Sequence, residues 1–320
     1  MARKLIIDAD PGMGDAFAIA LAALDPQLDL IGVTAVPGCV SGHLATQNIL
    51  AVIESVDPPK LPRVGAASGP RPNFGNNSSF LDPLRLNGNY GLGTTELQFM
   101  EMHNQRDSVK VLIDLVRNNP HEVTLLTLGP LTNVSVALDL APDIGELLQS
   151  LVCLCGSIGV GGDATAAAEF NVFANPNAAV NVFQSNATRT MVPLDVSNNV
   201  MLSFDQFNRA SDLAPRKLSW FFESLLPFSL RVHHEELGWE GVPIREAAAL
   251  AYIAEPRHFE TDAMYVDVEL QAELTRGATI FDRRGTIPRS QRNIEVVNSV
   301  DSHGVLDYVT RVLKSTISDT

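Results

Sequence analysis

The chain has 320 residues, of which 45% are hydrophobic and 19% charged, and its formal net charge is −14. The hydrophobic share allows a sizeable core, whereas the acidic balance argues against nucleic-acid binding, which needs a basic face. No run of about 18 apolar residues occurs, so we expect no membrane-spanning helix. Because no linker-like segment divides the sequence, we expect a single domain over residues 1–320.

Two features favour a cytoplasmic location. The chain passes from Arg3 and Lys4 into an apolar run that is too short for a signal peptide. The three cysteines are an odd number, and Cys153 and Cys155 alternate within an apolar run, as buried strand residues do. This pattern fits free thiols in a reducing compartment, and two thiols without a partner pair do not indicate a metal site.

Predicted strands and helices alternate along the chain. Strands are expected at residues 4–8, 30–36, 123–127, 151–155 and 189–193. Helices are expected at residues 15–24, 43–55, 108–118, 131–140 and 176–184. This alternation predicts an α/β fold of βαβ units, in which a mostly parallel open sheet is flanked by helices, as in Rossmann-like topologies.

Three segments do not follow this alternation. Residues 66–98 are rich in Gly, Pro, Asn and Ser, which predicts a long loop and suggests a mobile lid over a site. Residues 217–238 read as one or two helices broken at Pro227. The segment contains the aromatic residues Trp220, Phe221, Phe222 and Phe228. We expect these rings in the core, with stacking on a ligand as the alternative. In the tail, residues 292–298 and 302–315 predict a strand and a helix.

Residues 4–15 contain three closely spaced aspartates. Asp8, Asp10 and Asp15 follow a short apolar strand and flank a Pro-Gly turn. Open α/β sheets bind ligands at the carboxyl ends of their strands. Three carboxylates there repel one another unless a cation lies between them, and an all-oxygen set favours calcium or magnesium over zinc. Ordinary roles remain open, since Asp15 suits a helix N-terminus and Asp8 a solvated strand end.

Four ordered blocks resemble one enzyme family. Residues 4–15 resemble the Asp-x-Asp-Pro-Gly-x-Asp-Asp signature of the nucleoside hydrolases, the inosine–uridine-preferring N-ribohydrolases. Residues 127–133 (Thr-Leu-Gly-Pro-Leu-Thr-Asn), 168–171 (Ala-Glu-Phe-Asn) and 241–246 (Gly-Val-Pro-Ile-Arg-Glu) resemble its later motifs. The resemblance implies the family fold and hydrolysis of the N-glycosidic bond of nucleosides, giving ribose and free base. It also implies assembly as a homodimer or homotetramer.

The resemblance further implies a calcium site. Its ligands would be Asp10, Asp15, the backbone carbonyl of Leu128, and Glu246, with Asp8 supporting them from behind. Glu246 stands where the family has Asp, which keeps the charge and adds one methylene. Asp10 matches the residue that accepts a proton from the attacking water.

The substrate side departs from the family pattern more often. Glu169 and Asn171 match residues that hold ribose hydroxyls, but Asp163 replaces the usual Asn, and Arg245 replaces a His that protonates the leaving base. Arginine keeps its proton, so Arg245 is not a general acid. It either pairs with an anionic group of the substrate or neutralises the surrounding acids.

Three further positions differ from the family: Gly14 replaces the second of two paired aspartates, Cys39 an Asn, and Asn87 a His. We therefore expect a nucleoside hydrolase with altered substrate preference, acting on a small nucleoside-like molecule. Two alternatives stay open. One is a hydrolase of another N-glycoside or sugar derivative. The other is a degenerate member that binds metal and ligand with little turnover.

Overall fold

The computed structural model describes residues 2–74, 80–94, 105–212 and 216–315. Within them, nine strands form one sheet in the order β10-β13-β7-β6-β5-β1-β2-β3-β4. Their bounds are β1 (Arg3–Ala9), β2 (Leu28–Ala35), β3 (Arg63–Ala66), β4 (Arg106–Asp107), β5 (Val123–Thr127), β6 (Ser150–Leu154), β7 (Arg189–Val192), β10 (Phe259–Met264) and β13 (Ile294–Val300). Two small antiparallel pairs accompany it: β8 (Met201–Ser203) with β9 (Gly241–Pro243), and β11 (Val266–Val268) with β12 (Thr279–Phe281).

The order of the strands creates a crevice beside β1. The chain first adds β2, β3 and β4 on one side of β1, then returns to add β5, β6 and β7 on the other side. These neighbours are all parallel, whereas β10 pairs antiparallel with β13 at the edge. Where the direction of strand addition reverses, the loops after β1 and β5 diverge, and this is the usual ligand site of open α/β sheets.

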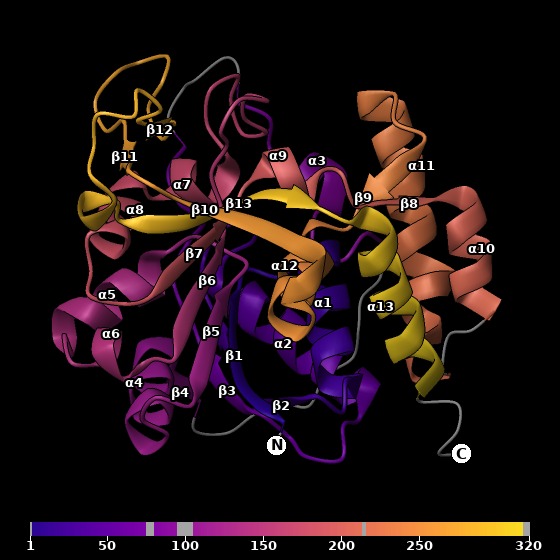
Figure 1. Cartoon of the computed structure of the whole chain (residues 1–320). Coiled ribbons are helices and arrows are strands. Elements are labelled where there is room, and N and C mark those ends of the chain that lie inside the picture. Colours follow the sequence, from indigo (N-terminus) through magenta and orange to yellow (C-terminus); the bar gives the residue numbers. More distant parts are fainter. Residues whose placement is uncertain (1, 75–79, 95–104, 213–215, 316–320) are drawn as a thin grey trace.

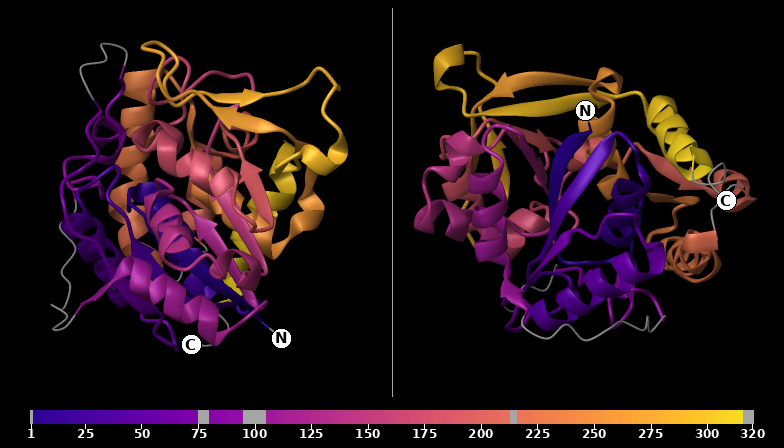
Figure 2. Two further views of the ribbon diagram at one scale, coloured as in Figure 1. Left: turned by 90° about the vertical axis from the view of Figure 1, so that its left-hand side faces the viewer. Right: turned by 90° about the horizontal axis from the view of Figure 1, so that it is seen from below.

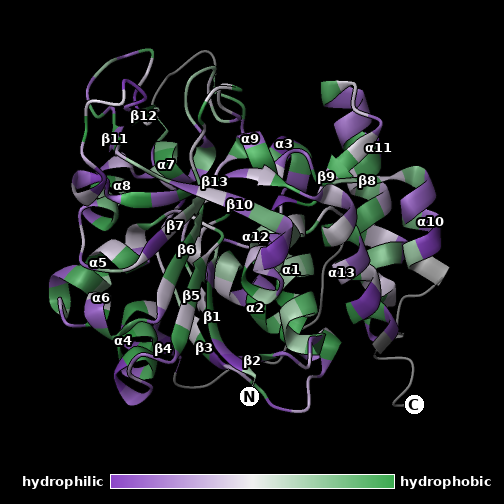
Figure 3. Ribbon diagram, viewed as in Figure 1, coloured by the Kyte–Doolittle hydropathy of each residue, from purple (hydrophilic) through white to green (hydrophobic). Residues whose placement is uncertain are grey.

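Helices cover both faces of this sheet (Figures 1 and 2). One face packs against α1 (Met13–Leu24), α2 (Gly42–Val56), α12 (Arg245–Ala254) and α13 (Ser302–Ser315). The other packs against α4 (Ser108–Asn118), α5 (Thr132–Leu140) and α8 (Pro176–Phe183). In β1, Leu5 and Ile7 join the first core and Ile6 the second, as the two-residue period of a strand requires. Figure 3 shows hydrophobic colour concentrated on the sheet and on α1.

Shorter segments complete the described fold. The helices are α3 (Leu84–Asn87), α6 (Ile144–Leu147), α7 (Phe170–Ala174), α9 (Leu194–Ser197), α10 (Phe204–Asp212) and α11 (Leu226–Leu237). Three-residue 3₁₀ turns lie at Arg216–Leu218, Pro256–His258 and Arg289–Gln291, and a π-helical turn spans Phe221–Leu225. No helix formed by the described residues is both long and apolar enough to cross a membrane.

The predicted α/β class is confirmed, with a mostly parallel sheet between helices. All five predicted strands and all five predicted helices occur, and the tail forms β13 and α13 as expected. The strands β3, β4 and β10 were not predicted. β4 has only two residues, both exposed, and in β10 half of the residues are exposed and none is buried, so neither presents an apolar pattern in the sequence.

The irregularity expected at Pro227 takes the form of a π turn. The N–H of Leu226 donates to the carbonyl of Phe221, five residues back, and α11 continues directly with Pro227 in its first turn. Proline has no N–H to donate, so the widened turn falls where a regular helix bond would be missing. The spacing of the backbone hydrogen bonds therefore widens here from four to five residues, and the helix is not broken.

The predicted loop of residues 66–98 contains β3's last residue and α3 in its described part. Residues 75–79 and 95–98 lie outside the described residues. The described part is anchored at two points: Asn87 Oδ1 accepts from the N–H of Met13 at 3.0 Å, and Arg85 forms an ion pair with Glu236 of α11. This segment thereby lies beside the crevice, and its mobility stays a prediction.

Candidate active site

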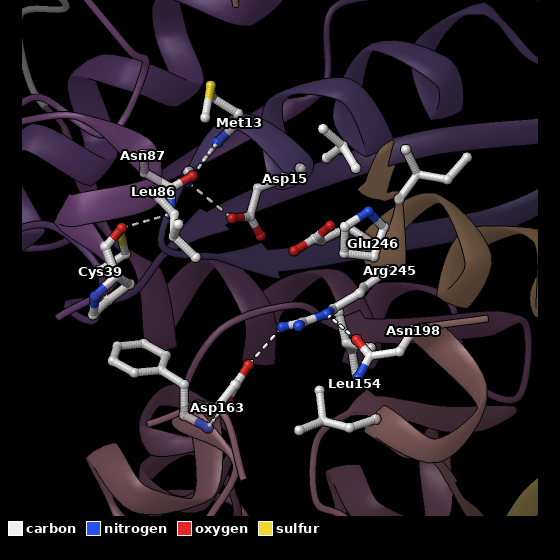
Figure 4. A pocket seen from close by; sticks show the side chains of 18 of the residues that line it. Met13, Asp15, Cys39, Leu86, Asn87, Leu154, Asp163, Asn198, Arg245 and Glu246 are labelled. Atoms are coloured by element: carbon white, nitrogen blue, oxygen red, sulfur yellow. Dashed lines mark hydrogen bonds and ion pairs between the residues drawn. The ribbon is translucent and has the colours of Figure 1, made fainter. Parts of the chain in front are cut away.

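A cavity of about 380 Å³ opens at the carboxyl ends of β1, β5 and β6. Its volume suits a small organic molecule. Five acidic residues line it: Asp10, Asp15, Asp163, Glu169 and Glu246. Figure 4 shows several of these side chains converging from different elements. The structure thus brings together residues that lie more than two hundred positions apart in the sequence.

Asp10 sits in a backbone cradle just beyond β1. Its Oδ2 accepts a hydrogen bond from the N–H of Cys39 at 2.5 Å. A Cβ atom on Gly38 or on Gly129 would overlap an Asp10 carboxylate oxygen. Burial, and next the charge of Asp15, raise the pKa of Asp10 well above its usual range. The side chain is therefore fixed in position and held in surroundings that disfavour its negative charge.

Asp15 and Glu246 face each other from the first turns of two neighbouring helices, α1 and α12 (Figure 4). Asp15 Oδ2 accepts from the N–H of Gly12 at 2.9 Å, whereas its buried Oδ1 has no hydrogen-bond partner. Burial and the charge of Glu246 raise the pKa of Asp15 to about 8. Burial also raises the pKa of Glu246. Two acids at helix N-termini gain from the helix dipoles, but not enough to offset the cost of burying their charges.

Asp8 lies behind the cavity wall and not on it. It is fully buried, and its Oδ1 accepts from Thr34 Oγ1 at 2.5 Å and from Asn133 Nδ2 at 2.8 Å. Its Oδ2 has no partner, and burial raises its pKa to about 7. Asp8 is therefore not a solvated strand end, and its support of the metal ligands stays a prediction.

Glu169 and Asn171 are largely engaged by the protein itself. The carboxylate of Glu169 accepts from the N–H groups of Gly156, Asn171 and Val172 at 2.9, 2.9 and 3.1 Å, and so caps α7. Because a carboxylate offers about four acceptor sites, little capacity remains for a ligand. Burial and Asp163 raise the pKa of Glu169 to about 8.

The side-chain amide of Asn171 uses both its hydrogens within the protein. It donates to the carbonyls of Leu128 and Leu154 at 2.7 and 2.8 Å. Asn171 therefore presents only its acceptor oxygen to the cavity. The Leu128 carbonyl, an inferred metal ligand, retains one free lone pair.

Arg245 is paired across the cavity. Its Nη1 donates to Asp163 Oδ2 at 2.5 Å and its Nε donates to Asn198 Oδ1 at 2.6 Å (Figure 4). Asp163 Oδ1 also accepts from the N–H of Phe170 at 2.9 Å. Of the two roles considered for Arg245, this geometry favours neutralising neighbouring acids over an open contact for a substrate anion.

The lining also has an apolar part, here called the apolar wall, which comes mainly from the segment around α11. Its side chains include Phe17, Phe221, Leu225, Leu226, Trp239, Val242 and Ile244. Phe221 stacks on Phe17 with ring centroids 4.3 Å apart, so it serves both the core and the cavity wall. Such a wall suits the flat, weakly polar face of a nucleobase.

His233 adds a polar group to this apolar wall. Its Nδ1 lies 2.8 Å from the carbonyl of Ser229, which can only accept, so Nδ1 carries the proton. Burial lowers the pKa of His233, which keeps the ring neutral at neutral pH. The remaining nitrogen, Nε2, is then an acceptor and not an acid.

Sequence reasoning missed several of these residues. Asn198 holds Arg245, and Trp239 lines the cavity, yet neither lies in a recognisable motif. The one available signal for Asn198 was its position shortly after β7, at the same edge of the sheet as the acids. The glycine cradle of Asp10 gave no signal because glycines are frequent in loops.

The donor set is of the kind that holds a hard divalent cation. An orphaned, buried oxygen of Asp15 and carboxylates that raise one another's pKa are the expected state of such ligands without their ion. No three His, Cys, Asp or Glu side chains in the described parts of the chain already stand close enough to hold a metal. A bound cation would therefore have to draw these carboxylates closer together.

Comparison with known proteins decides the family. Residues 5–307 match the family model of the inosine-uridine preferring nucleoside hydrolases. The chain belongs to the nucleoside hydrolase family. It is accordingly a hydrolase that acts on N-glycosyl bonds, and the resemblance inferred from the four sequence blocks is confirmed.

The relatives of this nucleoside hydrolase are distant but cover nearly all of it. It is 31% identical to an inosine-uridine preferring nucleoside hydrolase of Leishmania major, with 91% of each chain covered. It is 29% identical to the pyrimidine-specific ribonucleoside hydrolase RihA of Escherichia fergusonii, with 98% of this chain and 99% of the relative covered. The plant nucleoside hydrolase PpNRh1 superposes with a TM-score of 0.88 at 25% identity, over 98% of this chain and 100% of that one.

Proposed function

We propose that this nucleoside hydrolase is a calcium-dependent N-ribohydrolase that cleaves unphosphorylated nucleosides into ribose and free base. The observation that carries the proposal is the convergence of Asp10, Asp15 and Glu246 at the carboxyl end of β1, within one cavity. We further propose that residues 1–320 act as one domain, since these acids come from both the first and the second half of the chain. The cytoplasmic location and the homo-oligomeric assembly remain predictions.

The metal would be held by Asp10, Asp15, Glu246 and the carbonyl of Leu128. When bound, calcium would polarise a water molecule and offset the charge of the acids around it. Asp10 accepts a proton from the water that attacks the anomeric carbon of the sugar. Its cradle between Gly38 and Gly129 supports this role, because a fixed base holds the water in line with the breaking bond.

The remaining acids stabilise the sugar as the N-glycosidic bond breaks. Positive charge develops on the ring of the departing ribosyl group, and the surrounding carboxylates favour it electrostatically. The cavity offers mainly hydrogen-bond acceptors: the carboxylates of Asp163 and Glu246, the amide oxygen of Asn171 and Nε2 of His233. Such a surface suits the donor-rich hydroxyls of a sugar.

The same surface disfavours anionic substrates. The cationic group of Arg245 is already engaged by Asp163 and Asn198, so a phosphate would meet carboxylates without a free counter-charge. We therefore place nucleotides outside the substrate range. The proposal therefore disfavours one of the roles that the sequence left open for Arg245, pairing with an anionic group of the substrate.

A screen of nucleosides with detection of the free base tests the proposal, run in calcium and after removal of calcium by a chelator. Turnover that disappears with the chelator and returns with calcium supports it. Cleavage of other N-glycosides but no nucleoside would favour the second candidate, a hydrolase of another N-glycoside, which the changed residues Gly14, Cys39 and Arg245 motivate. Binding of calcium and ribose without turnover of any substrate would indicate a degenerate member.

A further inference from the structure

Gly14 lies in the first turn of α1, directly opposite Glu246. A Cβ atom built on Gly14 would come within 3.0 Å of all three terminal atoms of the Glu246 side chain, including 2.7 Å from Oε1. Real Cβ atoms essentially never make contacts below 3.0 Å. The Glu246 carboxylate therefore occupies the volume that any side chain at position 14 would need.

The backbone cannot easily relieve this contact. α1 and α12 pack directly against each other, and their buried faces are rich in alanine, including Ala16, Ala20, Ala247 and Ala251. Small side chains bring two helix axes close together and leave little slack at the interface. The first turns of the two helices are thus held close together, so a side chain at position 14 would have to displace the Glu246 carboxylate from its place near Asp15.

We propose that Gly14 and Glu246 are a matched pair, in which the missing side chain at position 14 lets the longer Glu246 carboxylate reach the calcium site beside Asp15. Gly14 is a positioning residue in this scheme and does not itself touch the metal. The inference rests on the proposed calcium site. The sequence departs from the family at both positions, with a lost aspartate at 14 and an added methylene at 246. In this proposal the two departures depend on each other, because the first makes room for the second.

Calcium affinity in a double-mutant cycle tests the pairing. The proteins are the wild type, Gly14→Ala, Glu246→Asp and the double variant, with calcium binding measured by titration calorimetry on chelator-stripped full-length protein. In the protein that has Glu246, Gly14→Ala should weaken calcium binding at least tenfold. In the Glu246→Asp background the same change should weaken it less than threefold, because the shorter acid leaves room for a methyl group. Equal losses in both backgrounds, or no loss in either, overturn the proposal.

Two controls separate this outcome from other failures. Gly145→Ala adds a methyl to another helix, where the nearest contact is 3.3 Å from Leu138, and should leave calcium binding unchanged. Alanine favours helix over glycine, so Gly14→Ala should fold, as circular dichroism will show.

A metal-free measurement keeps the inference independent of the proposed function. If the wild type binds no calcium, the proposed calcium site is wrong. Thermal unfolding then tests by itself whether Gly14 and Glu246 depend on each other. Without metal, Gly14→Ala should raise the melting temperature less in the protein that has Glu246 than in the Glu246→Ala background, where the clash is gone. An equal rise in both backgrounds would show that Glu246 does not need the space above Gly14.

Discussion

Calcium binding to this hydrolase should depend steeply on pH. Burial and the charge of Glu246 raise the pKa of Asp15 to about 8, so at pH 7 this carboxyl is mostly protonated in the metal-free protein. Calcium requires the carboxylate, and binding must expel that proton. Since burial also raises the pKa of the other two acidic ligands, Asp10 and Glu246, we expect release of at least about one proton per calcium at pH 7, and affinity that rises at least about tenfold per pH unit between about pH 6 and 7.

Stability of the metal-free protein should move in the opposite direction. Asp15 has a higher pKa folded than its ordinary value of 3.8, so between about pH 4 and 8 the folded state binds more protons than the unfolded state. Unfolding free energy therefore falls as pH rises through this window. Added calcium should restore most of the stability at the alkaline end, where the repelling carboxylates are charged.

Titration calorimetry in buffers of different ionisation enthalpy measures the proton release directly. The slope of observed enthalpy against buffer enthalpy gives the number of protons, and thermal unfolding across pH gives the stability profile. Asp15→Asn is the matched control, since it keeps the shape but loses both the proton and the metal contact. Calcium affinity that stays constant from pH 6 to 8, with no dependence on buffer, would refute the reasoning.

Three further outcomes are expected. Asp10→Asn should reduce turnover by about 10²–10⁴-fold with an unchanged circular dichroism spectrum, because the amide keeps the shape but cannot accept the water's proton; wild-type turnover would remove Asp10 from the base role. A riboside with a nitrophenyl leaving group should be cleaved far better than inosine, since neither Arg245 nor neutral His233 can protonate a departing base; equal efficiency on both, measured by kcat/KM, would reveal another acid. Nucleoside 5′-monophosphates should be cleaved at least about 100-fold less efficiently than the nucleosides in a free-base assay, because a phosphate meets unpaired carboxylates; comparable rates would mean that Arg245 leaves Asp163 to bind phosphate.

The parts of the fold that could be predicted are those with local signals. Buried strands such as β1 and β5 contain short apolar runs, and helices such as α4 show a clear amphipathic period. The edge strand β4 gave no such signal because it is short and exposed. Its pairing is decided by its neighbour β3 and not by its own composition.

The site divides in the same way. Asp10 and Asp15 stand in one dodecamer at a strand end, and their exposure to a common cavity follows from the topology of parallel sheets. The partners of Arg245 could not be read from the sequence, since Asp163 and Asn198 lie 82 and 47 positions away. Only tertiary structure tells whether a charged residue in a cavity is free or already paired.

The departures from the family pattern argue against simple decay of the site. By the motif resemblance, Arg245 and Asp163 stand where the family has a His and an Asn, and these two residues bind each other at 2.5 Å. Asn87, in place of a His, accepts a hydrogen bond from Met13 at the start of α1. Loss of function without selection would be expected to leave such polar groups buried and unpaired, at a cost of about 1–3 kcal/mol each. Here the side chains of Arg245, Asp163 and Asn87 each have a hydrogen-bond partner, which argues for a cavity whose polar groups were matched to one another and against one that was abandoned.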